Sequence, residues 1–183
     1  MQRLVICGTP VLYTPDECTR ENERVRHVAF VRCSVANSSG FDPADLADWN
    51  AAIVAGDATV IANVRGTYDG GAATENAGYG DVPTELTGMI HTLTYFDPRV
   101  RVNCNFYNQI KYLASDYRFF FFTATRGWRV LRPVRVFARM PVAETTETFV
   151  NYEVTVKWSH IDLPCPFDSP FDDGCLNLPS FGG

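Results

Sequence analysis

Histidines, cysteines and clustered carboxylates are the residues of this 183-residue chain that could do chemistry. The three histidines, His27, His91 and His160, each fall in or at the end of an expected strand. None of them belongs to an H-E-x-x-H or triad-like pattern, and the chain has no G-x-S-x-G elbow, Walker loop or dinucleotide fingerprint. We therefore expect structural histidines and predict that the protein is not an enzyme.

Thiols and acidic side chains do not form a recognisable metal site either. No two cysteines have C-x-x-C spacing, and no histidine stands at ligand spacing to them, which favours free, mostly buried thiols. A Cys165–Cys175 disulfide is the alternative. Asp168, Asp172 and Asp173 are close in sequence, but their spacing does not match a calcium-binding EF-hand loop. We predict no metal and no cofactor. The six cysteines are Cys7, Cys18, Cys33, Cys104, Cys165 and Cys175.

Composition predicts one globular domain with a substantial core. Hydrophobic residues make up 46% of the chain, and the net charge of -5 argues against a nucleic-acid binder. No apolar run reaches the length of about 18 residues that a membrane span needs. The apolar stretch at the N-terminus is too short for a signal peptide, so we expect folding in a reducing cytoplasm.

Charge is distributed unevenly along the chain. Residues 98–140 contain nine basic residues and one acid, whereas residues 141–183 contain one lysine and seven acids. Residues 37–97 contain one arginine and nine acids. Strands that alternate core residues with solvated arginines would explain this pattern. Complementary faces on one molecule, suited to self-assembly, would explain it equally well.

The stretch of residues 87–140 organises the expected fold. It predicts a strand over 89–96, a short helix over 104–114 and a strand over 117–123, then a strand over 128–140. Asn103 is the expected N-cap of the helix, and Phe106, Ile110 and Leu113 are its expected buried face. Pro133 indicates an edge position or a bulge in the last strand.

The phenylalanine run within 117–123 has aromatic side chains pointing to both sides, which is typical of a central strand buried on both faces. Such a strand must be covered by a second sheet, by a helix or by another subunit. Because the chain has so much apolar surface, we expect copies of the protein to cover it for one another.

The rest of the first 159 residues adds further strands and one helix. Strands are expected over 26–36, 59–64 and 148–158, the last with clean alternation of apolar and polar residues. A helix is expected from Asp42, as its cap, to Gly56. The fold class is therefore mainly β, a β-sandwich or curled antiparallel sheet, with one or two short flanking helices and a single domain over 1–159.

Two segments do not fit the regular pattern and are the candidate sites of intersubunit contact. Residues 66–83 are rich in glycine and alanine, which predicts a long loop that orders against a partner. Residues 160–183 form an expected proline-rich arm that lies extended along a surface of its own chain or of a neighbour. The candidate contact residues are Tyr68, Asp69, Tyr79, Asp81, Phe167, Phe171, Leu176 and Phe181.

The second half of the chain resembles structural proteins of tailed bacteriophages, particularly tail-tube-like proteins of phages that infect Bacteroidota. Three segments carry the resemblance: TELTGMIHTLTYFDPRV, then NFYNQIKYLASDYRFFFFTATRGWRVL, then TFVNYEVTVKWSHIDLPCPFDSP. The similarity lies in the order of the expected elements. A strand is followed by a helix that begins with NFYN, then by two strands, and last by a strand with a proline-rich tail. The first third of the chain does not share it.

The resemblance implies a tail-tube-like virion protein that forms homo-oligomeric rings, usually hexameric and stacked into a tube. Such a tube also contacts other virion proteins and lets double-stranded DNA pass without specific binding. On this interpretation the protein is a tail tube, ring or connector subunit located in the virion, with no membrane partner. The alternative is a carbohydrate- or ligand-binding β-sandwich on a virion surface, with Tyr68, Tyr79 and the aspartates lining a sugar site.

Overall fold

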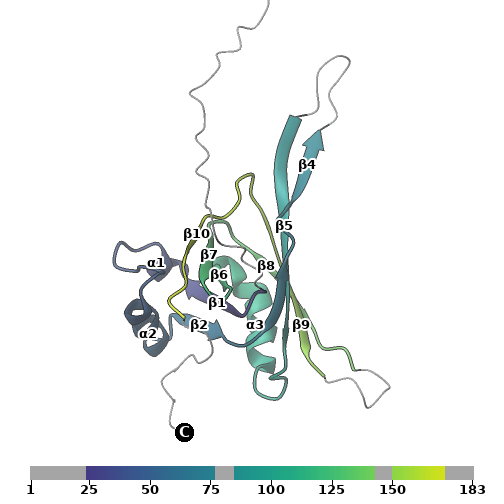
Figure 1. The fold of residues 1–183 in the computed structure, drawn as a ribbon. Helices are drawn as coiled ribbons and strands as arrows, with labels where there is room; N and C mark the ends of the chain where they lie inside the picture. The colour runs from purple at the N-terminus through teal and green to yellow at the C-terminus, as the bar shows by residue number, and fades with distance from the viewer. Residues whose placement is uncertain (1–23, 77–84, 143–149, 172–183) are drawn as a thin grey trace, which may run out of the picture.

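The computed structural model describes residues 24–76, 85–142 and 150–171, and the protein is mainly β. Ten strands form two antiparallel sheets in this part of the chain (Figure 1). The first sheet has the order β10-β7-β6-β1-β2, and the second has the order β3-β5-β9-β8, with β4 also paired to β5. The predicted fold class is confirmed.

The strands of the first sheet are β1 (His27–Arg32), β2 (Ala58–Ile61), β6 (Tyr117–Phe122), β7 (Arg126–Val130) and β10 (Pro166–Asp168). Those of the second are β3 (Arg65–Tyr68), β4 (Ala72–Asn76), β5 (Glu85–Asp97), β8 (Arg135–Arg139) and β9 (Tyr152–Ser159). The helices are α1 (Cys33–Ala36), α2 (Leu46–Val54) and α3 (Cys104–Leu113), and α3 continues into a 3-10 turn, Ala114–Asp116.

The core lies between the two sheets. Phe119 and Phe121 of β6 face Leu93 of β5 and Val154 of β9, and all four side chains are almost fully buried. The alternation predicted for the late strand is confirmed, because Tyr152, Val154, Val156 and Trp158 are the buried residues of β9. β6 and β9 thus contribute every second side chain to this core, as a sandwich requires.

The other face of the phenylalanine strand is covered by the chain itself. Phe120 and Phe122 point away from the second sheet and pack against Trp49 of α2, with ring centroids 5.2 and 5.6 Å apart. Phe171 packs on Phe122 at 4.8 Å, and Phe41 completes the cluster. The expectation that other copies must cover this strand is therefore wrong, since α2 and the C-terminal arm do so within one chain.

The two predicted helices form close to their expected positions, as α2 and α3, but the cap of α2 and the buried face of α3 differ from the prediction. Asp45, not Asp42, caps α2, and its carboxylate accepts a hydrogen bond from the Ala47 N–H at 2.9 Å. In α3 the buried side chains are Tyr107 and Ile110, whereas Leu113 is 44% exposed. The predicted face missed Tyr107, which turns inward and donates its hydroxyl hydrogen bond to the buried Asp97 carboxylate.

The expected long strand over 128–140 is two strands in different sheets. β7 pairs with β6 in the first sheet, and β8 pairs with β9 in the second. Residues 131–134 cross between the sheets, and Pro133 lies in this crossing. Proline cannot donate a ladder hydrogen bond, which is compatible with a crossing and not with a continuous strand.

Residues 66–83 were expected to be a loop without regular structure, but two strands occupy much of this range. β3 pairs with the second half of β5, and β4 pairs with its first half. β9 pairs with β5 only from Ile90 onward. Residues 85–89 and β4 therefore form a two-stranded ribbon, named here the β4–β5 ribbon, which projects from the sandwich (Figure 1).

The described part of the C-terminal arm lies on its own chain. β10 pairs with β7, and Phe167 sits against Gly127, where an added Cβ would come within 2.6 Å of the Phe167 ring. The arm thus forms an edge of the first sheet before Phe171 enters the aromatic cluster.

Candidate functional site

The residues that could do chemistry have structural partners. His27 is 5% exposed and its Nδ1 accepts a hydrogen bond from the Asn63 N–H at 3.3 Å. Burial, with a smaller effect of the Arg26 charge, lowers the pKa of His27 to about 4, so this ring is neutral at pH 7. Asp168 pairs with Arg126 across the β10–β7 edge. Within the described residues no three His, Cys, Asp or Glu side chains gather to hold a metal ion.

The described cysteines, Cys33, Cys104 and Cys165, are free thiols and are exposed or half-buried. The expectation of mostly buried thiols is therefore wrong for these three. Cys7, Cys18 and Cys175 lie outside the described residues, as do Asp172 and Asp173.

Asp97 is the most completely enclosed carboxylate of the described chain, and its role is to fix a connection. Its side chain has no exposed surface and accepts hydrogen bonds from the Arg99 Nε at 2.9 Å, Asn103 Nδ2 at 3.0 Å and Tyr107 hydroxyl at 2.9 Å. Burial acts to raise the pKa of Asp97, but the hydrogen bonds from Arg99 and Tyr107 outweigh it and the pKa lies below its usual value. Asn103 thus ties the start of α3 to the end of β5. The prediction that its side chain caps the helix is wrong, because Asn103 makes no side-chain cap hydrogen bond.

A stack of three rings stands at the base of the β4–β5 ribbon. The ring of His91 stacks on Trp158 with centroids 5.2 Å apart, and Tyr68 stacks on Trp158 at 5.6 Å and on His91 at 6.0 Å. His91 Nε2 lies 3.0 Å from the His160 carbonyl oxygen, which can only accept, so we assign the proton to Nε2. Nδ1 then accepts from the Tyr68 hydroxyl at 2.7 Å. This arrangement locks β3, β5 and β9 together where the ribbon begins.

The predicted contact residues divide into two groups. Tyr68 belongs to the stack just described, and the Asp69 carboxylate accepts from the Gly71 and Thr92 N–H groups. Phe167 and Phe171 pack within their own chain, and Phe171 is only 3% exposed. These four side chains therefore have intramolecular roles. Tyr79, Asp81, Leu176 and Phe181 lie outside the described residues.

The stacking of Tyr68 also bears on a sugar site. A sugar needs an open aromatic face, but Tyr68 is half-buried between Trp158 and Phe121, whose ring lies 5.1 Å away. Nothing in the described residues favours the carbohydrate-binding alternative.

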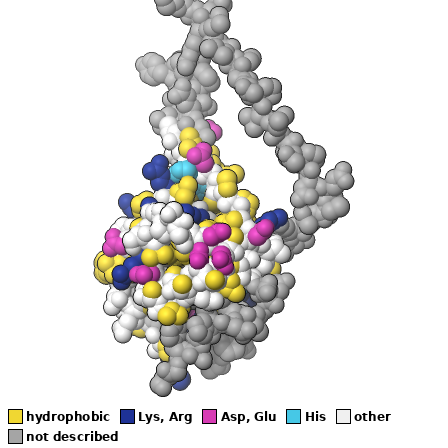
Figure 2. Space-filling model, turned by 90° about the vertical axis from the view of Figure 1, so that its left-hand side faces the viewer, with side chains coloured by type: hydrophobic (Ala, Val, Ile, Leu, Met, Phe, Trp, Pro, Cys, Tyr) yellow, Lys and Arg dark blue, Asp and Glu magenta, His cyan; other side chains and the backbone are white. Residues whose placement is uncertain are grey.

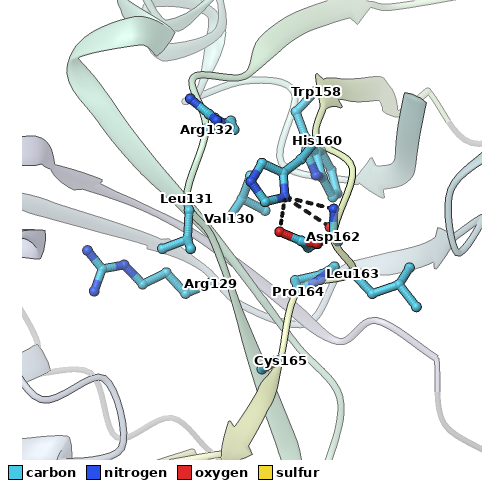
Figure 3. A pocket seen from close by; sticks show the side chains of 10 residues that line it. All are labelled: Arg129, Val130, Leu131, Arg132, Trp158, His160, Asp162, Leu163, Pro164 and Cys165. Atoms are coloured by element: carbon cyan, nitrogen blue, oxygen red, sulfur yellow. Dashed lines mark hydrogen bonds and ion pairs between the residues drawn. The ribbon is translucent and has the colours of Figure 1, made fainter. Parts of the chain in front are cut away.

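A small pocket lies where the chain leaves β9 (Figure 3). Its volume is about 390 Å³, and its walls include Val130, Leu131, Pro164 and Trp158. His160 Nδ1 accepts from the Asp162 N–H at 3.2 Å and lies 3.9 Å from the Asp162 carboxylate. Cys165 stands at the far end of the pocket from His160, so the two do not form a nucleophile and base pair (Figure 3).

A larger groove runs over the second sheet and is named here the cationic groove. Its volume is about 1010 Å³. Apolar side chains with large exposed fractions line it, namely Ile90 at 48%, Phe137 at 56% and Ile161 at 50%. Arg132, Arg135 and Lys157 also line it, and no acidic side chain of the described segments does. The predicted alternation of residues 148–158 places Lys157 on the polar side of its strand, but the meeting of Lys157 with Arg135 and Phe137 in one groove required the sheet pairing.

The cations of this groove have no anionic partner among residues 24–76, 85–142 and 150–171. Arg135 and Lys157 stand directly opposite each other in the β8–β9 register. The side chains of Arg132, Arg135 and Lys157 make no ion pair or hydrogen bond within the described part of the chain. Like charges at opposed positions destabilise a sheet. The groove is therefore suited to receive an anionic group on an apolar support.

Comparison with known proteins adds no family to this description: no family model, curated protein or solved structure matches the chain. Among the described residues no helix has both the length and the apolar character needed to cross a lipid bilayer.

Proposed function

We propose that this protein is a non-enzymatic structural subunit of a tailed bacteriophage virion that self-assembles, as a tail tube, ring or connector component. The β4–β5 ribbon is the observation that carries the proposal. Ala72, Ala73, Thr74 and Glu75 are all exposed, and β4 has no pairing partner other than β5 among the described strands. A two-stranded ribbon of this kind is marginally stable by itself.

The ribbon's base is held by stacked rings and hydrogen bonds although the ribbon is exposed, and this combination favours a contact role. The stack of Tyr68, His91 and Trp158 sets the direction in which the ribbon leaves the sandwich. A segment held in a fixed direction loses less conformational entropy when a partner binds it. Strand addition to the free edge of β4 is one established mode of such association.

The sequence resemblance supplies the virion context, and the fold is compatible with it. A mainly β domain with a short helix against the sandwich is what the resemblance implies, and α3 packs its Tyr107 and Ile110 into the core between the sheets. The self-covered phenylalanine strand gives the proposal no support.

Truncation of the ribbon tests the proposal. Replacing residues 74–88 by the dipeptide Asn-Gly keeps the Ala73–Met89 pair and closes it with a two-residue turn. We expect the wild-type chain to form rings or tubes at high concentration, seen by electron microscopy and light scattering. The truncated chain should stay monomeric, and a β-type circular dichroism spectrum with a cooperative thermal transition would show that it is folded. Equal assembly of both chains would remove the ribbon from the mechanism, and a wild-type chain that stays monomeric at every concentration would contradict self-assembly.

A further inference from the structure

The proposed self-assembly leaves open which surfaces meet, and the charges of the two outer faces point to an answer. The cationic groove lies on the outer face of the second sheet. The first sheet's outer face is covered by α1 and α2, and residues 33–64, which include both helices, contain four aspartates and neither lysine nor arginine. Acidic side chains gather in the middle of this side of the molecule (Figure 2).

The α2 surface is amphipathic on its solvent side. Leu46 is 45% and Val54 is 68% exposed, and Ala47 and Ala51 between them are exposed as well. Asp42, Asp45 and Asp48 stand beside this apolar stripe at the start of the helix. The inner side of α2 is occupied by Trp49 and Ala52, so the outer stripe has no partner within the described chain.

The cationic groove and the α2 surface are complementary in charge, and both carry exposed apolar side chains. The cationic groove combines Ile90, Phe137 and Ile161 with three unpaired cations, and the α2 surface combines exposed aliphatic side chains with aspartates. Complementary charge at an interface selects the partner and fixes its register. An apolar helix face laid in an apolar groove is a recurrent mode of recognition.

We propose that the α2 surface of one copy docks in the cationic groove of a second copy. The inference rests on the proposed self-assembly and names its contact. Because the sheets pack face to face, the two surfaces lie on opposite sides of the sandwich. The contact is therefore heterologous, and repeated contacts of this kind close into rings or continue as open stacks.

Charge exchange in the full-length chain tests this contact without disturbing the helix caps. Ala47→Lys with Ala51→Lys adds positive charge to the α2 stripe, where neither alanine side chain is buried. Arg135→Glu with Lys157→Glu reverses the groove. Sedimentation velocity over a concentration series, with a reducing agent present, measures self-association, and circular dichroism checks the fold. Arg101→Glu with Lys111→Glu, at exposed cations outside the groove, is the matched control.

We expect each of the two sets to weaken association on the order of tenfold, and the four substitutions together to restore it to within about threefold of the wild type. The control should change association by less than about twofold. If neither double substitution changes the measured self-association, the α2 contact is overturned while the self-assembly proposal stands. If each double substitution weakens association but the four substitutions together do not restore it, the α2 contact is overturned as well.

Other occupants of the groove give distinct results. If Asp172→Lys with Asp173→Lys restores the reversed groove and the α2 lysines do not, the C-terminal segment is the occupant and the α2 contact is overturned. If groove reversal abolishes binding of a labelled single-stranded oligonucleotide and leaves self-association unchanged, the groove binds nucleic acid and the inference is again overturned. A wild-type chain that never associates would contradict the proposed function itself.

Discussion

At the scale of single residues, His27 makes the stability of the fold depend on pH. Its pKa is about 4 in the folded protein, against 6.5 in an unfolded chain. Between these values the unfolded chain binds the proton and the folded chain does not. The contribution of the neutral ring is therefore complete above pH 6.5 and is lost progressively as the pH falls towards 4.

We predict that the free energy of unfolding falls by about 2 kcal/mol more in the wild type than in His27→Gln between pH 8 and pH 4.5. Glutamine retains an acceptor for the Asn63 N–H but does not titrate. Urea denaturation at the two pH values measures the difference. The same pH-dependent loss in both proteins would show that His27 is not the group responsible. The hydrogen bonds from Arg99 and Tyr107 lower the pKa of Asp97 from its usual value, which moves its titration away from the pH range of this comparison.

At the scale of elements, the turn between β3 and β4 sets where the ribbon begins. Gly70 and Gly71 both have positive φ, at 78° and 90°. A Cβ at Gly71 would lie 2.6 Å from His91 Nδ1, whereas one at Gly70 would meet no atom within 4 Å. Glycine at residue 71 is therefore required both by its backbone conformation and by the closeness of the ring stack.

We expect Gly71→Ala to lower the free energy of unfolding by about 2–4 kcal/mol, because the His91 ring must move in addition to the backbone strain. Gly70→Ala, the matched control, should cost only about 1 kcal/mol from the strain alone. Chemical denaturation measures both. Equal costs for the two variants would contradict the assigned packing of His91 against the turn.

The C-terminal arm is the second element whose role can be measured. Phe171 closes the aromatic cluster over Trp49 and Phe122 and is buried. Phe171→Ala should destabilise the protein by about 3–5 kcal/mol, the usual cost of removing a buried phenylalanine. Leu131→Ala, at a residue that is 61% exposed, should cost less than about 1 kcal/mol. If Phe171→Ala were as mild as the control, the arm would not hold the first sheet's cover in place.

The sequence predicted these elements where the pattern is local. The alternation of residues 150–158 and the phenylalanine run were sufficient to place β9 and β6. The division of 128–140 between two sheets was missed, because Pro133 was interpreted as an edge position or a bulge of one strand, whereas it lies in a crossing between two sheets. β4 was missed because Ala72, Ala73 and Thr74 face solvent, so no apolar period marks the strand.

The candidate site was less predictable than the fold for a similar reason. Uneven charge in the sequence indicated complementary faces, and the structure places Arg135 and Lys157 on one outer face and the α2 aspartates over the other sheet. The groove joins residues from β5, β8 and β9 and from the connection after β9, which are far apart in the chain. Only the strand pairing brings them together. Tyr68 was a predicted contact residue because it lies in the glycine-rich stretch 66–83, and Phe171 because the C-terminal arm is apolar, but the fold uses both in its own interior.

At the scale of the whole molecule, the described residues cover their own aromatic strand and leave two features open among themselves. These are the β4–β5 ribbon and the pair of oppositely charged outer faces. A stable monomer is therefore compatible with this fold at low concentration, and association should depend on concentration and weaken with added salt. The resemblance to tail-tube-like proteins and these open surfaces lead to the same expectation of an ordered homo-oligomer.

The most direct measurement is the mass and shape of the purified full-length chain as its concentration is raised. Light scattering coupled to size-exclusion chromatography, with electron microscopy of the same fractions, gives both quantities. The account predicts rings or stacked rings for the wild type and a folded monomer when residues 74–88 are replaced by Asn-Gly. A wild-type chain that remains a monomer at the highest attainable concentration would contradict it.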